Sequence, residues 1–122
     1  MKDFKNLEVW QAAHDLTLAI YSATSIFPKH ELFGLTSQLR RSAASIGWNI
    51  AEGCGRGGQV EFNRFLDIAS GSCKEVEYQL LLARDLHYIA DELYGSLDRE
   101  LKSIRRRIAG LQRSINNGAR NL

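Results

Sequence analysis

Four segments of this chain repeat apolar residues at steps of three and four positions, the spacing of a helix with one buried face. They cover about residues 6–27, 33–52, 59–89 and 91–116. No stretch alternates with period two over the length of a strand, and the only proline, Pro28, falls between the first two segments. The pattern predicts an all-α fold: a single domain over residues 1–122 that forms an antiparallel up-and-down four-helix bundle.

Individual residues sharpen the predicted helices. Gly53 suits a left-handed cap at the end of the second segment, and the fourth segment is expected to fray at residues 116–118. His87 continues the apolar stripe of the third segment, which predicts a hydrogen-bonded, half-buried side chain. Gly47 and Gly71 lie inside predicted helices, where we expect them to let a neighbouring helix approach closely.

Composition narrows the functional classes. Two cysteines are too few for a disulfide framework or a zinc site, which favours a reducing compartment. The first residues lack the apolar core of a signal peptide, and no apolar run approaches the ~20 residues needed to cross a bilayer. We therefore expect a cytoplasmic protein with no membrane contact.

No catalytic site is evident in the sequence. Residues 53–58 match G-x-G-x-x-G, but a predicted helix precedes them where a nucleotide-binding site needs a strand, so we predict an interhelical loop. The three histidines have no metal-ligand spacing. Cys54 follows a helix C-terminus, whose dipole disfavours a reactive thiolate. We predict no enzymatic activity, no metal and no cofactor.

Charge is concentrated near the C-terminus. Residues 99–122 carry seven Lys or Arg and one acid, whereas residues 62–98 carry three against seven. On a helix Arg99, Lys102, Arg106 and Arg113 fall within about 60° of one another. Three interpretations of this basic face are open. It is a solvated surface, a site for nucleic-acid phosphates, or a contact with the acidic third helix of a neighbouring subunit. The candidate nucleic-acid-binding residues are Arg99, Lys102, Arg105, Arg106, Arg113, Arg40, Arg41 and Arg56.

Apolar surface is predicted to remain after each chain has closed its core. Residues 80–90 are apolar around nearly the whole circumference of the third helix, which a lone four-helix bundle does not readily cover. Trp48 points away from the buried stripe of the second helix, as an interface anchor would. We predict a homo-oligomer. Its candidate interface residues are Trp48, Leu82, Leu86 and Ile89.

The order of motifs resembles a known family. Gln38-Leu39-Arg40-Arg41 opens the second helix, Asn49-Ile50-Ala51-Glu52-Gly53 closes it, and Glu61-Phe62-x-x-Phe65-Leu66 follows in the third. These runs resemble the small four-helix-bundle proteins associated with intervening sequences in bacterial 23S rRNA genes. The resemblance extends over about residues 4–115.

The resemblance implies a homopentamer and kinship with accessory proteins of diversity-generating retroelements, which bind nucleic acid and a reverse transcriptase through basic surfaces. It does not imply ribosome membership, since residence within an rRNA gene is not binding to rRNA. We predict a non-enzymatic oligomeric protein that binds RNA or DNA with little sequence specificity. The alternative is a protein-interaction scaffold that binds a protein partner and no nucleic acid.

Overall fold

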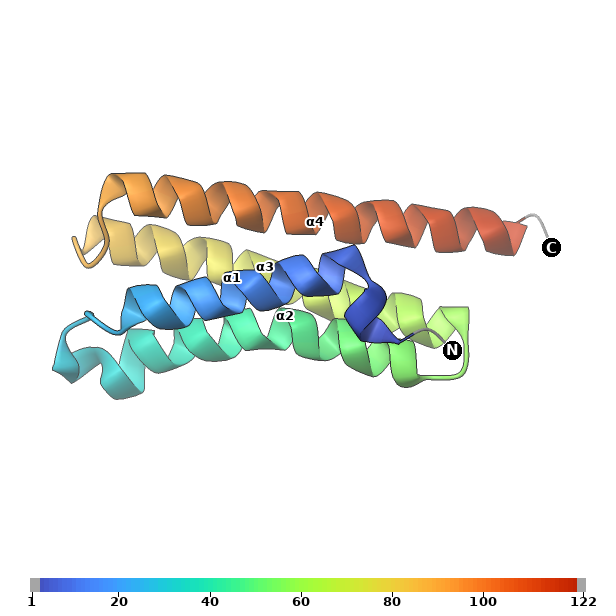
Figure 1. Cartoon of the computed structure of the whole chain (residues 1–122), viewed down its shortest axis with the longest axis horizontal. Coiled ribbons are helices and arrows are strands. Elements are labelled where there is room, and N and C mark those ends of the chain that lie inside the picture. The colour runs from blue at the N-terminus through green and yellow to red at the C-terminus, as the bar shows by residue number, and fades with distance from the viewer. Residues whose placement is uncertain (1–2, 121–122) are drawn as a thin grey trace.

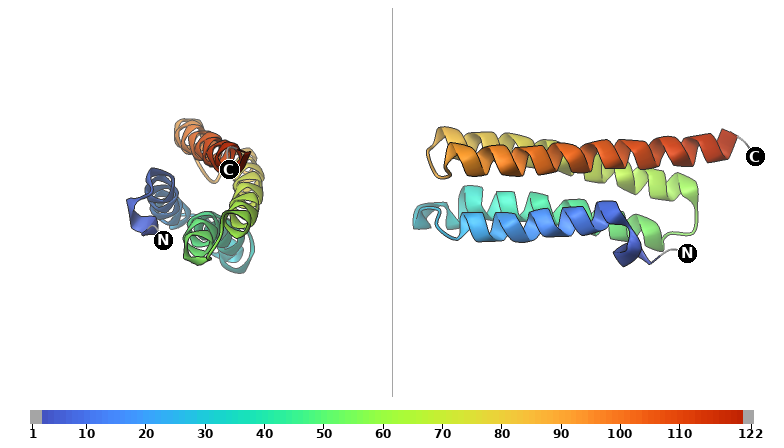
Figure 2. Two further views of the ribbon diagram at one scale, coloured as in Figure 1. Left: turned by 90° about the vertical axis from the view of Figure 1, so that its right-hand side faces the viewer. Right: turned by 45° about the horizontal axis from the view of Figure 1, so that its top comes forward.

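The computed structural model describes residues 3–120, with side chains described for residues 3–118. These residues form four long helices that alternate in direction (Figure 1) and occupy the corners of a four-sided bundle in the end-on view (Figure 2). The predicted all-α four-helix fold is confirmed. The helices are α1 (Glu8–Thr24), α2 (Ser37–Gly55), α3 (Gln59–Asp85) and α4 (Asp91–Arg120).

Each helix packs against two neighbours around a single core. α1 contacts α2 and α4, and α3 contacts α2 and α4, with the most extensive contact between α2 and α3. Fully buried side chains come from every helix, among them Leu16, Ile46, Leu66 and Leu101. Burying one such side chain contributes about 1.5–3 kcal/mol. None of the described helices combines the length and apolar character that crossing a bilayer requires.

The connection between α1 and α2 is built around Glu31. It contains a 3-10 turn, η2 (Lys29–Glu31), and a π-helical turn, η3 (Leu32–Thr36), in which Gly34 has non-helical backbone angles. One carboxylate oxygen of Glu31 accepts a hydrogen bond from the backbone N–H of Leu35 at 3.2 Å. A Cβ on Gly34 would lie 2.8 Å from that same oxygen, so glycine leaves room for the carboxylate.

α3 ends at Asp85, four residues before the predicted boundary at residue 89. His87 has a φ of 63°, the Tyr88 N–H reaches the carbonyl of Ala83, and the His87 N–H reaches that of Arg84. This pair of bonds is a Schellman motif, which ends a helix with one left-handed residue. The prediction of a half-buried His87 is therefore wrong: the side chain is exposed because its backbone terminates the helix.

Two other predicted details are also corrected. Gly53 is not a left-handed cap: it lies buried in the last turns of α2, and a Cβ there would come within 2.8 Å of Phe62 and 2.9 Å of Phe65. α4 continues through Gly118 to Arg120 where fraying from residue 116 was expected. A short apolar pattern fixes the middle of a helix better than its ends, which depend on local backbone bonds.

The apolar surplus predicted for the third helix is mostly covered by the chain itself. Ile89 is only 6% exposed, and Leu82 is partly buried against the core. Leu86 remains 44% exposed and Trp48 74% exposed. Ile89 and Leu82 therefore offer little surface to a neighbouring chain. The turn after α3 folds residues 88–89 back onto the bundle, and Leu82 within α3 packs against the core.

Candidate nucleic-acid interface

α4 turns one side to the core and the opposite side to solvent. Its buried side consists of Leu97, Leu101, Ile104 and Ile108, each at most 3% exposed. The helix begins with Asp91 and Glu92 in its first turn, where negative charge suits the positive end of the helix dipole. The basic residues follow on the solvent side, as the sequence predicts.

Three arginines form the exposed part of this face. Arg99, Arg106 and Arg113 follow one another at intervals of seven residues, close to two helical turns, and all three are exposed. At a rise of 1.5 Å per residue they extend over about 21 Å of α4. None of them makes an ion pair or hydrogen bond with another residue in the described part of the chain. Their guanidinium groups are available to an external anion.

Lys102 and Arg105 are partly engaged within the chain. The Lys102 ammonium lies 2.8 Å from a carboxylate oxygen of Asp98, and this hydrogen bond raises the pKa of Lys102. Arg105 donates to Glu77 on α3 at 2.9 Å, with both side chains about 30% exposed. Lys102 can still contribute charge to the face, whereas Arg105 mainly connects α4 to α3.

Two glycines on the solvent side of α4 lie beside arginines of the basic face, and the sequence did not predict this role for them. A Cβ on Gly95 would lie 3.3 Å from a terminal nitrogen of Arg99, and one on Gly110 would lie 3.6 Å from a terminal nitrogen of Arg113. Two arginines thus lie over positions that have no side chain. The three- and four-residue spacing of each pair was the sequence signal for this arrangement.

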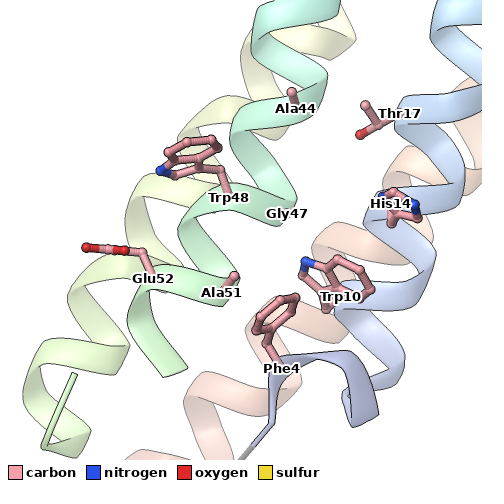
Figure 3. A pocket seen from close by; sticks show the side chains of 9 residues that line it. All are labelled: Phe4, Trp10, His14, Thr17, Ala44, Gly47, Trp48, Ala51 and Glu52. Carbon is pink, nitrogen blue, oxygen red and sulfur yellow. The ribbon is translucent and has the colours of Figure 1, made fainter. Parts of the chain in front are cut away.

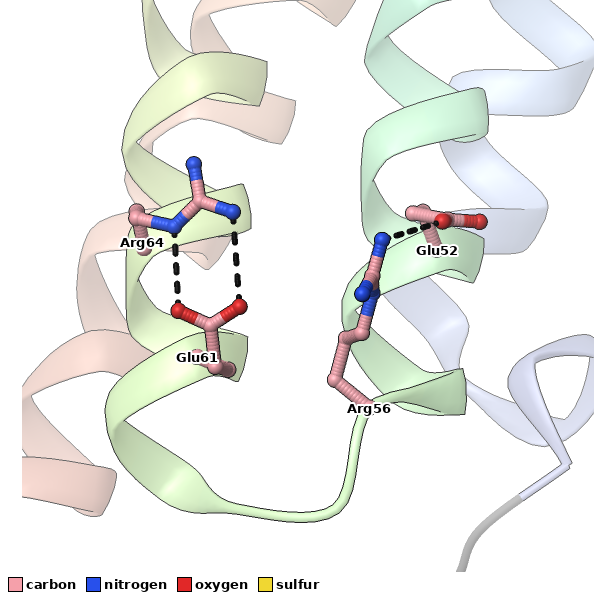
Figure 4. A network of polar contacts seen from close by, with 4 residues as sticks. All are labelled: Glu52, Arg56, Glu61 and Arg64. Carbon is pink, nitrogen blue, oxygen red and sulfur yellow. Dashed lines mark hydrogen bonds and ion pairs between the residues drawn. The ribbon is translucent and has the colours of Figure 1, made fainter.

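The candidates outside α4 are not brought to the same face. Arg40 donates to the Thr24 hydroxyl at 2.7 Å and to the Tyr21 carbonyl at 3.3 Å, so it joins α2 to α1. Arg56 pairs with Glu52 at 2.9 Å (Figure 4) and lies over the Phe65 ring. Arg41 is exposed on α2, a helix that makes no extensive contact with α4. The basic face is therefore confined to α4.

An aromatic groove, which the sequence did not predict, lies between α1 and α2. It has a volume of about 440 Å³, and its α2 side is lined by Ala44, Gly47, Trp48, Ala51 and Glu52. On the α1 side Trp10 stacks on His14 of the same helix, with ring centroids 5.0 Å apart, and Phe4 meets Trp10 edge-on (Figure 3). A Cβ on Gly47 would lie 3.4 Å from the Trp10 ring nitrogen, which agrees with a close-approach role for this glycine.

The remaining titratable groups do not form a reactive cluster in the described residues. Burial raises the pKa of the Cys73 thiol to about 11, which keeps it protonated at neutral pH. Cys54 is also buried, at the end of α2. Among the side chains that are described, no group of three His, Cys, Asp or Glu residues comes together in a metal-binding arrangement.

Comparison with known proteins identifies the family. Residues 5–110 match the family described as 23S rRNA-intervening sequence protein. The chain belongs to this family. The match covers α1, α2 and α3 in full and two thirds of α4, including Arg99 and Arg106 but not Arg113. A comparison with curated proteins gave no match.

A solved relative supports the same architecture. It is the crystal structure of a protein with unknown function from the S23 ribosomal protein family of Bacteroides thetaiotaomicron. The two sequences are 26% identical, the match covers 85% of this chain and 97% of the relative, and the TM-score is 0.77. The family and the bundle are thus established together, while the family description assigns no activity.

Proposed function

We propose that this protein is a non-enzymatic oligomeric binding protein whose α4 face holds the phosphates of RNA or DNA. One observation carries the proposal: Arg99, Arg106 and Arg113 are exposed in one row with no partner among the described residues. Lys102 adds a fourth positive charge on the same side. Such a row neutralises phosphates without reading bases, so binding is tolerant of sequence.

Assembly strengthens this interaction in the proposal. One bundle presents only a few cations, but several copies of α4 in a closed oligomer sum to a stronger field. The exposed Trp48 supports an oligomer, since large exposed aromatics commonly anchor protein contacts. We propose the homopentamer that the family resemblance implies.

The proposal is tested by reversing the charge of the row. The triple variant Arg99→Glu, Arg106→Glu, Arg113→Glu, with Lys102 left in place, is titrated against single-stranded RNA and duplex DNA of equal length. The matched control, Lys5→Glu, Lys29→Glu, Lys74→Glu, changes net charge equally at exposed positions elsewhere. We expect the first variant to lose binding and the control to retain most of it.

Salt dependence gives a second readout from the unmodified protein. Three neutralised phosphates per chain predict a slope of about −2.7 in log affinity against log salt on duplex DNA. This corresponds to a loss of roughly 40-fold per engaged chain between 50 and 200 mM salt. Affinity that is independent of salt, or unchanged in the triple variant, would refute the α4 assignment.

The aromatic groove favours a second candidate, a protein-interaction scaffold without nucleic-acid binding. Trp10, Phe4 and His14 offer an apolar surface that suits a protein segment better than a polyanion. This candidate predicts no salt-sensitive gel shift. It also predicts a specific protein recovered by the native chain and lost with Trp10→Ala.

A further inference from the structure

The solvent sides of α2 and α3 carry two stripes with identical spacing. The first, here the α2 stripe, is Arg41, Ser45, Trp48 and Glu52. The second, the α3 stripe, is Arg64, Ile68, Gly71 and Glu75. In both, the steps are four, three and four residues, so each stripe lies along one side of its helix. Both begin with arginine and end with glutamate.

The middle of each stripe is apolar or small: Trp48, Ile68 and Gly71 are exposed, whereas Ser45 is half-buried and its hydroxyl hydrogen-bonds with that of Ser72 on α3 at 2.8 Å. Trp48 is 74% exposed and Ile68 is 41% exposed. In Figure 3 the Trp48 and Glu52 side chains lie on the outer side of α2, at the edge of the groove that they line together with Trp10. Figure 4 places Glu52 and Arg64 together on one side of the α2–α3 pair. The two stripes are neighbours on the surface of the molecule.

Gly71 has no explanation within the single chain. It lies in the middle of α3, where glycine is less favourable than alanine. A Cβ at this position would meet nothing within 4 Å in the chain. The sequence predicts that a neighbouring helix approaches closely at Gly71, but no described helix of the same chain does so. An open glycine beside two exposed apolar side chains is what a close contact with another molecule requires.

The charges of the stripes match when one helix is laid antiparallel on the other. In the register that sets Trp48 opposite Ile68, Arg41 meets Glu75, Ser45 meets Gly71, and Glu52 meets Arg64. Within the described part of the chain, neither Arg41 nor Glu75 has an ion pair or hydrogen bond partner. Within the chain, Glu52 already pairs with Arg56, and Arg64 already pairs with Glu61. The charges at this end of the two stripes are therefore balanced.

We propose that a second copy of this chain docks its α3 stripe on the α2 stripe, with Trp48 seated over Ile68 and the backbone at Gly71 close to Ser45. The stripes contain as many arginines as glutamates, so the surface suits another copy better than a polyanion. Each chain offers both stripes, and a contact between unlike stripes repeats around a closed ring. This inference specifies the interface of the oligomer in the proposed function and rests on that oligomer.

Gly71→Leu tests the close approach without harming the fold. The new side chain has free space in the single chain and raises helix propensity, so the bundle is expected to remain folded. It would collide with Ser45 and the adjacent Trp48 of the docked copy. We expect the dissociation constant of the assembly, measured by sedimentation velocity, to rise at least about tenfold. The matched control is Gly110→Leu on the solvent side of α4, which is expected to leave assembly unchanged.

Charge reversal tests the register. Arg41→Glu and Glu75→Arg should each weaken assembly, because like charges then face each other between chains. Mixing the two single variants should restore assembly in part. The new carboxylate at position 41 of one chain then meets the new guanidinium at position 75 of another, while one like-charged contact remains in a ring of five. An ion pair within one chain could not be rescued by mixing. Circular dichroism of each variant confirms that the helices are retained.

The outcomes separate this inference from the proposed function. A monomeric native protein would overturn both the interface and the oligomer on which it rests. An assembly of native mass that withstands Gly71→Leu and both charge reversals would overturn the interface alone. Loss of nucleic-acid binding in the α4 variants, with assembly intact, supports the separate location of the two surfaces.

Discussion

At the scale of single residues, the carboxylate of Glu31 joins both chain reversals at one end of the bundle. One oxygen accepts from the Leu35 N–H at 3.2 Å, and the other accepts from the Tyr88 hydroxyl at 2.9 Å. These bonds lower the pKa of Glu31 and raise the pKa of Tyr88. The sequence placed Glu31 in a loop, and nothing in a local pattern reveals a partner 57 residues away.

This contact predicts a loss of stability in acid. A lowered pKa in the folded state means that Glu31 stabilises the fold above the ordinary glutamate value of about 4.3, and that this contribution is lost as pH falls through the lowered value. Glu31→Gln should flatten the decline of unfolding free energy between about pH 5 and 3. Urea denaturation across that range measures it. The control Glu8→Gln removes an exposed carboxylate; a decline flattened equally there would contradict the role of Glu31.

His87 gives a second prediction at this scale. A residue with a side chain at φ 63° is strained relative to glycine, which adopts the left-handed region freely. His87→Gly should stabilise the protein by about 0.5–1 kcal/mol, whereas His87→Ala should bring no such gain. Thermal or urea unfolding distinguishes the two. Equal stability of the glycine and alanine variants would count against the backbone explanation.

At the scale of helices, two glycines that look alike in sequence have opposite surroundings. Gly53 faces Phe62 and Phe65 across the α2–α3 contact, whereas Gly71 faces open space. Gly53→Ala should destabilise the fold by about 1–3 kcal/mol through overpacking, and Gly71→Ala should stabilise α3 by up to about 1 kcal/mol. Both are measured in a Trp48→Glu background, so that the proposed assembly does not contribute to the unfolding free energy. The same sign for both substitutions would refute this interpretation of the contacts.

Periodicity predicted the four helices because each buries one side, and burial imposes a three- and four-residue repeat. The same geometry placed Arg99, Arg106 and Arg113 on the solvent side of α4. Helix ends were less predictable, since the Schellman motif at His87 depends on backbone bonds. The bond from Arg105 to Glu77 also escaped prediction, because it depends on how α4 is rotated against α3.

At the scale of the whole molecule, charge is separated by helix. The solvent side of α4 is positive through Arg99, Lys102, Arg106 and Arg113, while the α2 and α3 stripes balance. α2 and α4 do not pack extensively against each other, so the proposed nucleic-acid face and the Trp48 surface belong to different sides of the bundle. The sequence shows how many charges each helix carries, but only the packing of the helices shows that they lie on separate surfaces.

The connections divide the bundle into two helical hairpins. α1 with α2, and α3 with α4, are helical hairpins whose reversals share one end, where Tyr88 reaches Glu31. A single crossing at Gly57–Gly58 joins them at the other end (Figure 1). Cutting the backbone there leaves the core contacts between hairpins intact. Co-expressed fragments 1–57 and 58–122 should therefore reconstitute the bundle and co-elute on size exclusion; fragments that elute separately would show that the crossing itself is required.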